Sequence, residues 1–323
     1  MNVMEKKLFA EVAAEWLQDK KPYVKKSTYC AYALLIRNHL SPSFTDCDKI
    51  TETRVQTFVL NKLKFGLSQK AVKDMLVVLN MILRYAARRG YMSSCDMDIK
   101  FPKPKARQKL DVLDMKDQRR IIRYLTSNFS FMNLGIYICL CTGLRIGEVC
   151  ALAWDDIDID RGLICVSKTI QRLYMVDGDK KYTEVVIGTP KSISSIREIP
   201  ISQALMKVLS PLRKTAVGNF YVLTNSPFPI EPRAYRNYYN RLMKQLDLPH
   251  VRFHGLRHTF ATRCIESKCD YKVVSMLMGH SNIGTTLNLY VHPDIRQKRK
   301  CVEQMSLALA VDIDGEEGYE IAD

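Results

Sequence analysis

The chain has 323 residues, 47% of them hydrophobic, and its 49 Lys and Arg residues outnumber 34 Asp and Glu. This length and composition describe a globular protein that can bury a core in one large or two ordinary domains. The net charge of +15 favours a polyanionic partner such as nucleic acid; an anionic membrane surface, or no charged partner, are the alternatives. Residues 311–323 hold six acidic and no basic residues, so the rest of the chain is more basic than its average.

The cysteines and the N-terminus exclude several protein classes. None of the ten cysteines forms a CxxC pair, which disfavours a zinc ribbon or a thioredoxin-type motif. The N-terminal stretch MNVMEKKLFAEVAAEW has no signal-peptide core, and no uncharged apolar run approaches the roughly 18 residues of a membrane-spanning helix. We therefore expect a cytoplasmic protein with no membrane segment.

Residues 1–99 predict a small helical bundle. Apolar residues recur at helical spacing in four segments, and Thr51 and Ser68 are suitable N-caps for the last two. Glycine follows each of those two segments, as is typical of helix ends. The four predicted helices cover 5–19, 27–40, about 51–66 and about 68–90.

A linker and a second domain follow. The stretch KFPKPKARQK, residues 100–109, contains two prolines, five basic residues and no acidic one. It predicts an extended linker, which is either a solvated hinge or a basic segment that lies along a phosphate backbone. We expect a second domain over 110–310, and interpret the acidic tail 311–323 as a disordered end.

The second domain predicts a mainly α fold with a small antiparallel β-sheet. Between residues 162 and 201, short β-type runs alternate with the turn sequences DGDKK and PKSISS. The other segments have helical spacing. The predicted helices are 115–127, 131–142, 202–214, 232–246, 255–268, 270–279, 282–291 and 294–309.

Two arginines stand out by their surroundings. Arg145 lies in the apolar stretch CTGLRIGEVCALAW, where it must pair with a carboxylate, for which Glu148 is available, or bind an external anion. Arg257 follows His254 by three residues at the predicted start of a helix, where free amides attract anions. Those two side chains face the same side and could hold one phosphate. Zinc binding through His254 and His258 is disfavoured because the HExxH glutamate is missing.

Tyr290 is one of sixteen tyrosines, but its neighbourhood is unusual. Five of the six histidines lie within 43 residues that also contain Arg257 and Tyr290, a clustering that favours proton transfer. By periodicity alone, Tyr290 shares a helix face with Ile283 and Thr286. The residues therefore leave open whether Tyr290 is a reactive phenol or a half-buried packing residue.

Four strings then occur in order over about 150 residues: TGLRIGE, TPKSISSIREIPI, HGLRH and GHSNIGTTLNLY. Together they resemble the tyrosine recombinase (phage integrase) family, and the helical region before them resembles the SAM-like core-binding domain of that family. The offset of ten residues between His280 and Tyr290 is similar to that of integrases of bacterial conjugative and mobile elements. The resemblance covers nearly the whole chain.

The resemblance implies a catalytic site of two phosphate-binding arginines, a lysine, two histidines and a tyrosine nucleophile. These are, in chain order, Arg145, Lys191, His254, Arg257, His280 and Tyr290. Glu148 matches a supporting acidic position, and His258 is interpreted as a helix-packing residue. Lys168, Lys180 and Lys181 are rivals of Lys191 for the role of general acid.

The implied reaction is site-specific DNA recombination through a 3′-phosphotyrosyl intermediate. A phenol with a pKa of about 10 needs a base or a cationic pocket, and with the pocket supplied by side chains we expect no metal or other cofactor. The expected role is integration or excision of a mobile element. Xer-like dimer resolution or DNA inversion is the alternative, ahead of a type IB topoisomerase or a non-catalytic DNA-binding protein.

The implied partner is double-stranded DNA with specific recombination sites, on which four protomers assemble. We expect the helix near the C-terminus to dock on a neighbouring protomer, and an excisionase or DNA-bending protein is a further possible partner. Because the core-binding helices begin so near the start, we expect no separate arm-binding domain of the lambda type. The target sequence cannot be read, because base contacts depend on docking geometry.

Overall fold

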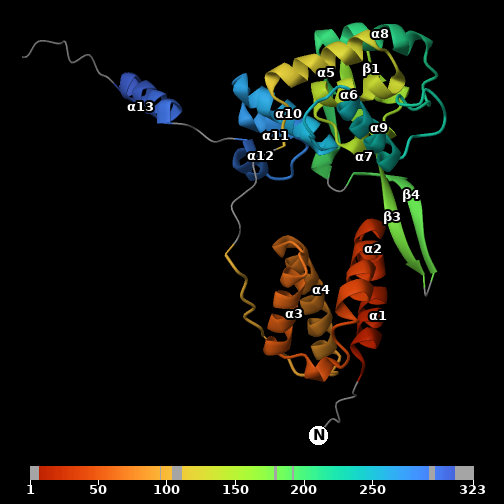
Figure 1. The fold of residues 1–323 in the computed structure, drawn as a ribbon, viewed down its shortest axis with the longest axis vertical. Helices are drawn as coiled ribbons and strands as arrows, with labels where there is room; N and C mark the ends of the chain where they lie inside the picture. The colour runs from red at the N-terminus through yellow and green to blue at the C-terminus, as the bar shows by residue number, and fades with distance from the viewer. Residues whose placement is uncertain are drawn as a thin grey trace, which may run out of the picture. The chain divides into compact units, whose positions relative to one another are not determined.

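The computed structural model describes residues 7–94, 96–103, 111–177, 180–190, 193–290 and 295–309. The fold is mainly helical with two small antiparallel sheets, which confirms the predicted fold class (Figure 1). The chain forms two compact units: residues 1–109 with 170–187, and residues 110–169 with 188–323. Within the described ranges, none of the helices is both long and apolar enough to cross a membrane.

The first unit contains a four-helix bundle around one apolar core. Thr51 and Ser68 accept hydrogen bonds from the third residue of the helix that each precedes, as the sequence predicts. The predicted helix 27–40 starts at Lys26 and changes to a π-helical turn over Ile36–Leu40. Trp16, Phe44 and Leu79 lie fully or almost fully buried in the core. The helices are α1 (Phe9–Lys20), α2 (Lys26–Leu35), α3 (Glu52–Lys64) and α4 (Gln69–Arg88).

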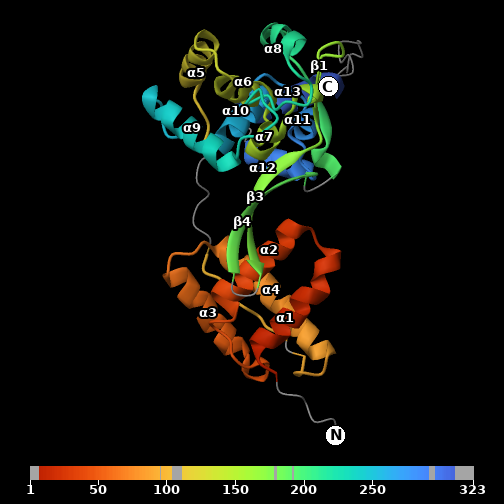
Figure 2. The ribbon, with the colours of Figure 1, turned by 90° about the vertical axis from the view of Figure 1, so that its right-hand side faces the viewer.

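A two-stranded hairpin belongs largely to the same unit. Strands β3 (Thr169–Asp177) and β4 (Lys180–Gly188) pair with each other and lie beside α2 (Figure 2). Lys26 of α2 forms an ion pair with Glu184 at 2.7 Å, and the sulfur of Cys30 lies 3.4 Å from that of Met175. The hairpin thus contacts a helix that is far from it in the sequence.

The second unit is built around α6 (Phe131–Thr142), which is apolar on nearly all sides and buried over most of its length. This confirms that the apolar run belongs in a core. Helix α6 contacts four other helices, namely α5 (Met115–Ser127), α7 (Ile146–Ala151), α9 (Pro232–Gln245) and α10 (Phe253–Glu266). The remaining helices are α8 (Gln203–Thr215), α11 (Tyr271–Met278), α12 (Ile283–Tyr290) and α13 (Ile295–Leu309).

A three-stranded antiparallel sheet completes this unit. Its order is β1 (Ile157–Asp158), β2 (Leu163–Val166) and β5 (Arg197–Pro200), with Ile164 opposite Ile199. The sequence predicts β2 and β5 but not the two-residue β1. Strand β5 also contacts α11, so the sheet positions its first residue against the end of that helix.

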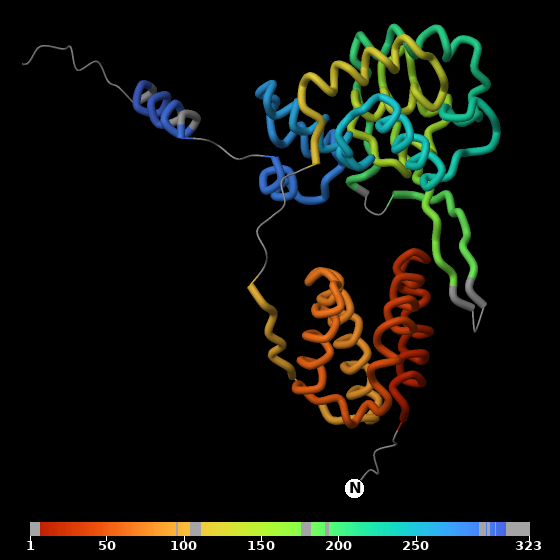
Figure 3. The backbone as a smooth tube through the Cα atoms, viewed as in Figure 1, coloured from red at the N-terminus to blue at the C-terminus, as the bar shows by residue number. Residues whose placement is uncertain are grey.

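Helices α10, α11 and α12 pack on one another, and Figure 3 traces them together in shades of blue. Helices α6 and α11 each end at a glycine in the left-handed conformation, Gly143 (φ 67°) and Gly279 (φ 60°). A Cβ added to Gly143 would stand 2.6 Å from the Phe260 ring. Glycine therefore allows both the turn and the close approach of α10.

Gly143→Ala should lower the free energy of unfolding by roughly 2–5 kcal/mol, because it adds left-handed strain of about 1–2 and overpacking of about 1–3. Gly162→Ala is the matched control: its φ is 66°, but its Cβ would meet only Met206, at 3.5 Å. The control should lose the backbone part alone. Urea unfolding followed by circular dichroism measures both, and equal losses would show that the Phe260 contact relaxes without cost.

Candidate active site

Three arginines converge on the C-terminal end of α11. The last carbonyl groups of a helix have no partner within it and carry partial negative charge. Here three consecutive carbonyls each accept a hydrogen bond from a different guanidinium. The pairs are Arg197 with Leu277 (2.6 Å), Arg257 with Met278, and Arg145 with Gly279 (3.0 Å).

The carboxylate of Glu148 neutralises part of the positive charge of these arginines. Its carboxylate is almost fully buried and lies 2.7 Å from Arg145 and 2.9 Å from Arg197, measured oxygen to nitrogen. It also accepts the backbone N–H of Arg145 at 2.9 Å. Burial acts to raise its pKa, but the hydrogen bond and charge of Arg197 and the charge of Arg145 bring the pKa below its ordinary value. Glu148 is therefore an ionised carboxylate that bridges Arg145 and Arg197.

Arg257 is the most deeply placed of the three arginines, with 2% of its surface exposed. A second hydrogen bond, of 2.8 Å, joins it to the carbonyl of Gly143, so it links the ends of α6 and α11. Burial first, and then the charge of Arg145, lower the pKa of its guanidinium. An arginine fixed in this way is a preorganised donor for an anion.

His254 and His280 are both neutral at physiological pH. Loss of solvent contact, together with the positive charges of Arg257 and Arg145, lowers the pKa of each to about 4. Nδ1 of His280 lies 2.8 Å from the hydroxyl of Thr286, which is fully buried in α12. That contact orients the imidazole so that Nε2 is the nitrogen left to meet a ligand.

Tyr290 lies at the end of α12, with its ring against a small apolar cluster of α10 and α11. Its hydroxyl oxygen is 2.6 Å from Nδ1 of His258. Burial raises the pKa of the phenol to about 12, although the charge of Arg257 acts to lower it. His258, which the sequence indicates as a packing residue, does stack edge-on with His254, but it also contacts the candidate nucleophile directly.

The structure brings five of the six predicted residues together. Arg145, His254, Arg257 and His280 act electrostatically on one another, and Arg257 acts on Tyr290. The sixth, Lys191, lies outside the described residues, as does His292. Of the rivals to Lys191, Lys168 forms an ion pair with Asp156 at 3.1 Å. Among the described residues, no group of three or more His, Cys, Asp or Glu side chains could hold a metal ion.

The sequence interpretation missed Arg197. This residue stands in the quoted string SIREIPI, whose single arginine among apolar residues was the available signal. Its side chain is 6% exposed, and its four nitrogen-to-oxygen contacts reach Glu148, Leu277 and Ser195. It holds both the carboxylate and the helix end against which the site is built.

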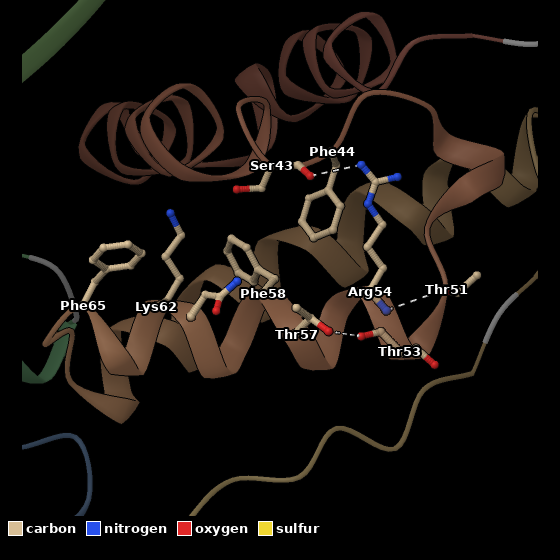
Figure 4. A pocket seen from close by; sticks show the side chains of 10 residues that line it. Ser43, Phe44, Thr51, Thr53, Arg54, Thr57, Phe58, Lys62 and Phe65 are labelled. Carbon is tan, nitrogen blue, oxygen red and sulfur yellow. Dashed lines mark hydrogen bonds between the residues drawn. The ribbon is translucent and has the colours of Figure 1, made fainter.

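The first unit has a pocket of its own, of about 560 Å³, along α3 (Figure 4). Arg54 donates to the backbone carbonyl of Ser43 and lies over the Phe44 ring, and Lys62 lies over the Phe58 ring. Threonine hydroxyls and the 81% exposed Phe65 complete the lining. The pocket combines cations, hydroxyl groups and aromatic faces.

Comparison with known proteins decides the family. The model of the phage integrase family matches residues 111–297, and that of the phage integrase N-terminal SAM-like domain matches residues 8–64. The chain belongs to the phage integrase family. It is a tyrosine-type site-specific recombinase, and the family predicted from the four strings is confirmed.

This recombinase is similar to a XerC-like recombinase and to integrases of mobile elements. It is 27% identical over 308 residues to a XerC-like tyrosine recombinase of Caldanaerobacter subterraneus, covering 87% of this chain and 78% of the relative. It is 26% identical over 288 residues to the ICEBs1 integrase of Bacillus subtilis, covering 85% and 75%. The Tn1549 transposon integrase, solved with transposon right end DNA, shares the fold with a TM-score of 0.76 at 23% identity, over 93% of this chain and all of the other.

Glu148→Gln should lower the free energy of unfolding at pH 7 by about 3 kcal/mol, because the buried guanidinium of Arg197 and the partly exposed one of Arg145 lose their counter-charge. The pKa of Glu148 is lower folded than its ordinary 4.5. Its stabilisation is therefore present above pH 4.5 and is lost as the pH falls through the folded pKa. The gap between variant and wild type should narrow in acid, as measured by urea unfolding at pH 7 and pH 4.

Glu198→Gln is the matched control for that experiment. Glu198 forms a two-pronged ion pair with Arg161, but both side chains are about half exposed. Its replacement should cost at most about 1 kcal/mol. If the two variants lose similar amounts of unfolding free energy, Glu148 is not a stabilising buried bridge between the arginines.

Proposed function

We propose that this recombinase cuts and rejoins DNA strands through a 3′-phosphotyrosyl intermediate, with Tyr290 as nucleophile, to integrate or excise a mobile element. One observation carries the proposal: a half-buried phenol lies within the electrostatic reach of Arg257, which shares the end of α11 with Arg145. A phosphate bound there would meet guanidinium groups that are already oriented.

In this proposal Arg145 and Arg257 bind the non-bridging oxygens of the scissile phosphate. Negative charge grows on those oxygens in the transition state, and fixed donors stabilise it without reorganising. Removing one such donor typically slows a reaction by roughly 100–1,000-fold. His254 and His280, both uncharged, supply further hydrogen bonds to the phosphate.

The Tyr290 oxygen attacks phosphorus, and the 5′ oxygen leaves with a proton from Lys191 as the proposed general acid. The phosphotyrosyl bond conserves the energy of the phosphodiester, so the 5′ hydroxyl of a second strand can religate without ATP. The pocket supplies its positive charge from side chains. The chemistry that we assign to the six residues therefore involves no metal.

The proposed partner is double-stranded DNA with specific recombination sites. We assign residues 1–99 to a core-binding domain, 100–109 to a basic linker, 110–310 to the catalytic domain and 311–323 to an acidic tail. Arg54 and Lys62 in the pocket along α3 are suited to phosphate contacts. Among relatives of the same fold, a lambda integrase has been solved as a dimer bound to a core site, at a TM-score of 0.62.

Self-assembly on DNA is part of the proposal. Helix α13 exposes large apolar side chains, including Val302 (60%) and Leu307 (74%). Such residues on a short terminal helix favour docking on a neighbouring protomer within a tetramer. An excisionase or DNA-bending protein would act on the same assembly.

The choice of a mobile element rests on the ICEBs1 integrase and on the transposase of transposon Tn916, which is 31% identical over 173 residues. The XerC-like relative supports the alternative, Xer-like dimer resolution or DNA inversion. We favour integration and excision because the offset of ten residues between His280 and Tyr290 resembles that of integrases of conjugative elements.

Tyr290→Phe should retain DNA binding and form no covalent adduct, since it lacks the attacking oxygen. Target duplexes are first selected from a random-sequence library by retention on this variant. They are then nicked next to the cleavage position, so that the released 5′ hydroxyl fragment diffuses away. Wild type should remain attached to the 3′ phosphate, giving a labelled adduct on a denaturing gel.

Tyr238→Phe is the matched control. Tyr238 is half-buried, and its hydroxyl group donates a hydrogen bond of 2.7 Å to Asn133. It lies on α9, which carries none of the six proposed catalytic residues. This variant should form the adduct at the wild-type level. An adduct formed by Tyr290→Phe would refute Tyr290 as the nucleophile.

Strand exchange should depend on paired sites. A supercoiled plasmid with two copies of the selected duplex should give deletion or inversion products according to their orientation, because exchange joins two cleaved sites. A plasmid without the sites should stay supercoiled. Relaxation of the plasmid without sites, with no exchange products from the other, would favour a type IB topoisomerase.

A further inference from the structure

His258 has no part in the chemistry described so far, yet it touches the reacting atom. Its Nδ1 lies 2.6 Å from the Tyr290 hydroxyl oxygen, and the two ring centroids are 5.7 Å apart. That oxygen must lose a proton when it attacks phosphorus. The contact is within the reach required of a general base.

We propose that His258 is the general base that accepts the phenol proton of Tyr290. The inference rests on the proposed phosphotyrosyl chemistry and adds the destination of one proton. It requires the neutral imidazole to carry its hydrogen on Nε2, so that the phenol O–H donates to Nδ1.

The position of His258 on α10 supports this role. It follows Arg257 directly, so one turn of helix presents both the phosphate-binding guanidinium and the ring nitrogen at the phenol. His254, one turn earlier, stacks edge-on against His258 with centroids 4.7 Å apart. This packing and the half-buried setting limit the rotation of the His258 ring, which keeps Nδ1 directed at Tyr290.

Helix α12, which carries Tyr290, is also held in a defined position. Thr286 and Tyr290 lie four residues apart on one face of α12, and each contacts a histidine, His280 and His258 respectively. Helix α12 is therefore held at two points one turn apart. The phenol oxygen has a defined position relative to Nδ1.

The electrostatics give the proton a path. Burial raises the pKa of Tyr290 to about 12, so at neutral pH the phenol needs a base to react. Burial and then the charges of Arg257 and Arg252 lower the pKa of His258, which keeps it neutral and able to accept, while Asp111 acts in the opposite direction. A bound phosphate adds negative charge that stabilises the imidazolium formed.

The step balances. The bond from the Tyr290 oxygen to phosphorus forms, the bond from phosphorus to the 5′ oxygen breaks, the phenol proton moves to His258, and the 5′ oxygen takes a proton from the general acid. On religation a 5′ hydroxyl attacks phosphorus and gives its proton to the conjugate base of the general acid, the phosphotyrosyl bond breaks, and the imidazolium returns its proton to the phenol oxygen.

His258→Asn is the decisive variant, because its side-chain oxygen can replace Nδ1 as a hydrogen-bond acceptor but cannot hold the proton. Adduct formation on the nicked duplex should slow by about 100-fold or more, the usual contribution of a general base. DNA affinity and thermal melting should equal those of wild type. His258→Gln serves as a second variant with the same expected loss.

A second substrate separates base from acid. Sulfur in place of the leaving 5′ oxygen departs without a proton, so it restores cleavage where a general acid is missing. The His258→Asn defect should persist on this 5′-bridging phosphorothiolate. Rescue by sulfur, or a rate for His258→Asn close to wild type on the normal duplex, would overturn the proposal. Absence of any adduct with wild type would instead refute the phosphotyrosyl function itself.

Discussion

The site depends on the hydrogen bonds that three arginines donate to backbone carbonyls at the C-terminal end of helix α11. The carbonyls of its last two residues, Leu277 and Met278, and of the following Gly279 each accept a hydrogen bond from a different arginine. The helix terminus thus holds together cations that would otherwise repel one another. The helix can end there because Gly279 takes the left-handed conformation. A Cβ on Gly279 would come within 3.1–3.2 Å of Ser194 and Arg197, so the same glycine also admits β5. One turn of backbone thus aligns three chain segments far apart in the sequence.

The charge balance of this cluster suits an anion. Arg145, Arg197 and Arg257 bring three positive charges, and Glu148 returns one negative charge, which it places between Arg145 and Arg197. Within the described part of the chain, Arg257 donates to the backbone carbonyls of Gly143 and Met278, and Glu148 acts on it through its charge. Burial of the Arg257 guanidinium lowers its pKa. A phosphate bound as proposed would add negative charge to this cluster, where one carboxylate faces three arginines.

The sequence predicts much of this molecule because its local signals are strong. Helices 115–127 and 131–142 match α5 and α6, and Thr51 and Ser68 act as N-caps, since capping and periodicity are properties of neighbouring residues. Contacts between distant segments could not be read in the same way. The pairing of Arg197 with Glu148, and the packing of β3 and β4 beside α2, depend on tertiary placement that no local pattern encodes. The motif strings identify Arg145 and Arg257, but not the carbonyls that hold them.

His258 illustrates the same limit at one residue. Its place in HGLRH, on a helix, is equally compatible with packing and with chemistry, and only the distance to Tyr290 separates the two. The opposite pressures on Tyr290 also become visible only in three dimensions: burial favours the protonated phenol, while Arg257 favours the phenolate. Burial prevails, so Tyr290, the proposed nucleophile, is kept protonated beside His258, the proposed acceptor. In the proposed reaction a phosphate beside the phenol and Arg257 would change that balance, because its negative charge stabilises the imidazolium that forms when the phenol loses its proton.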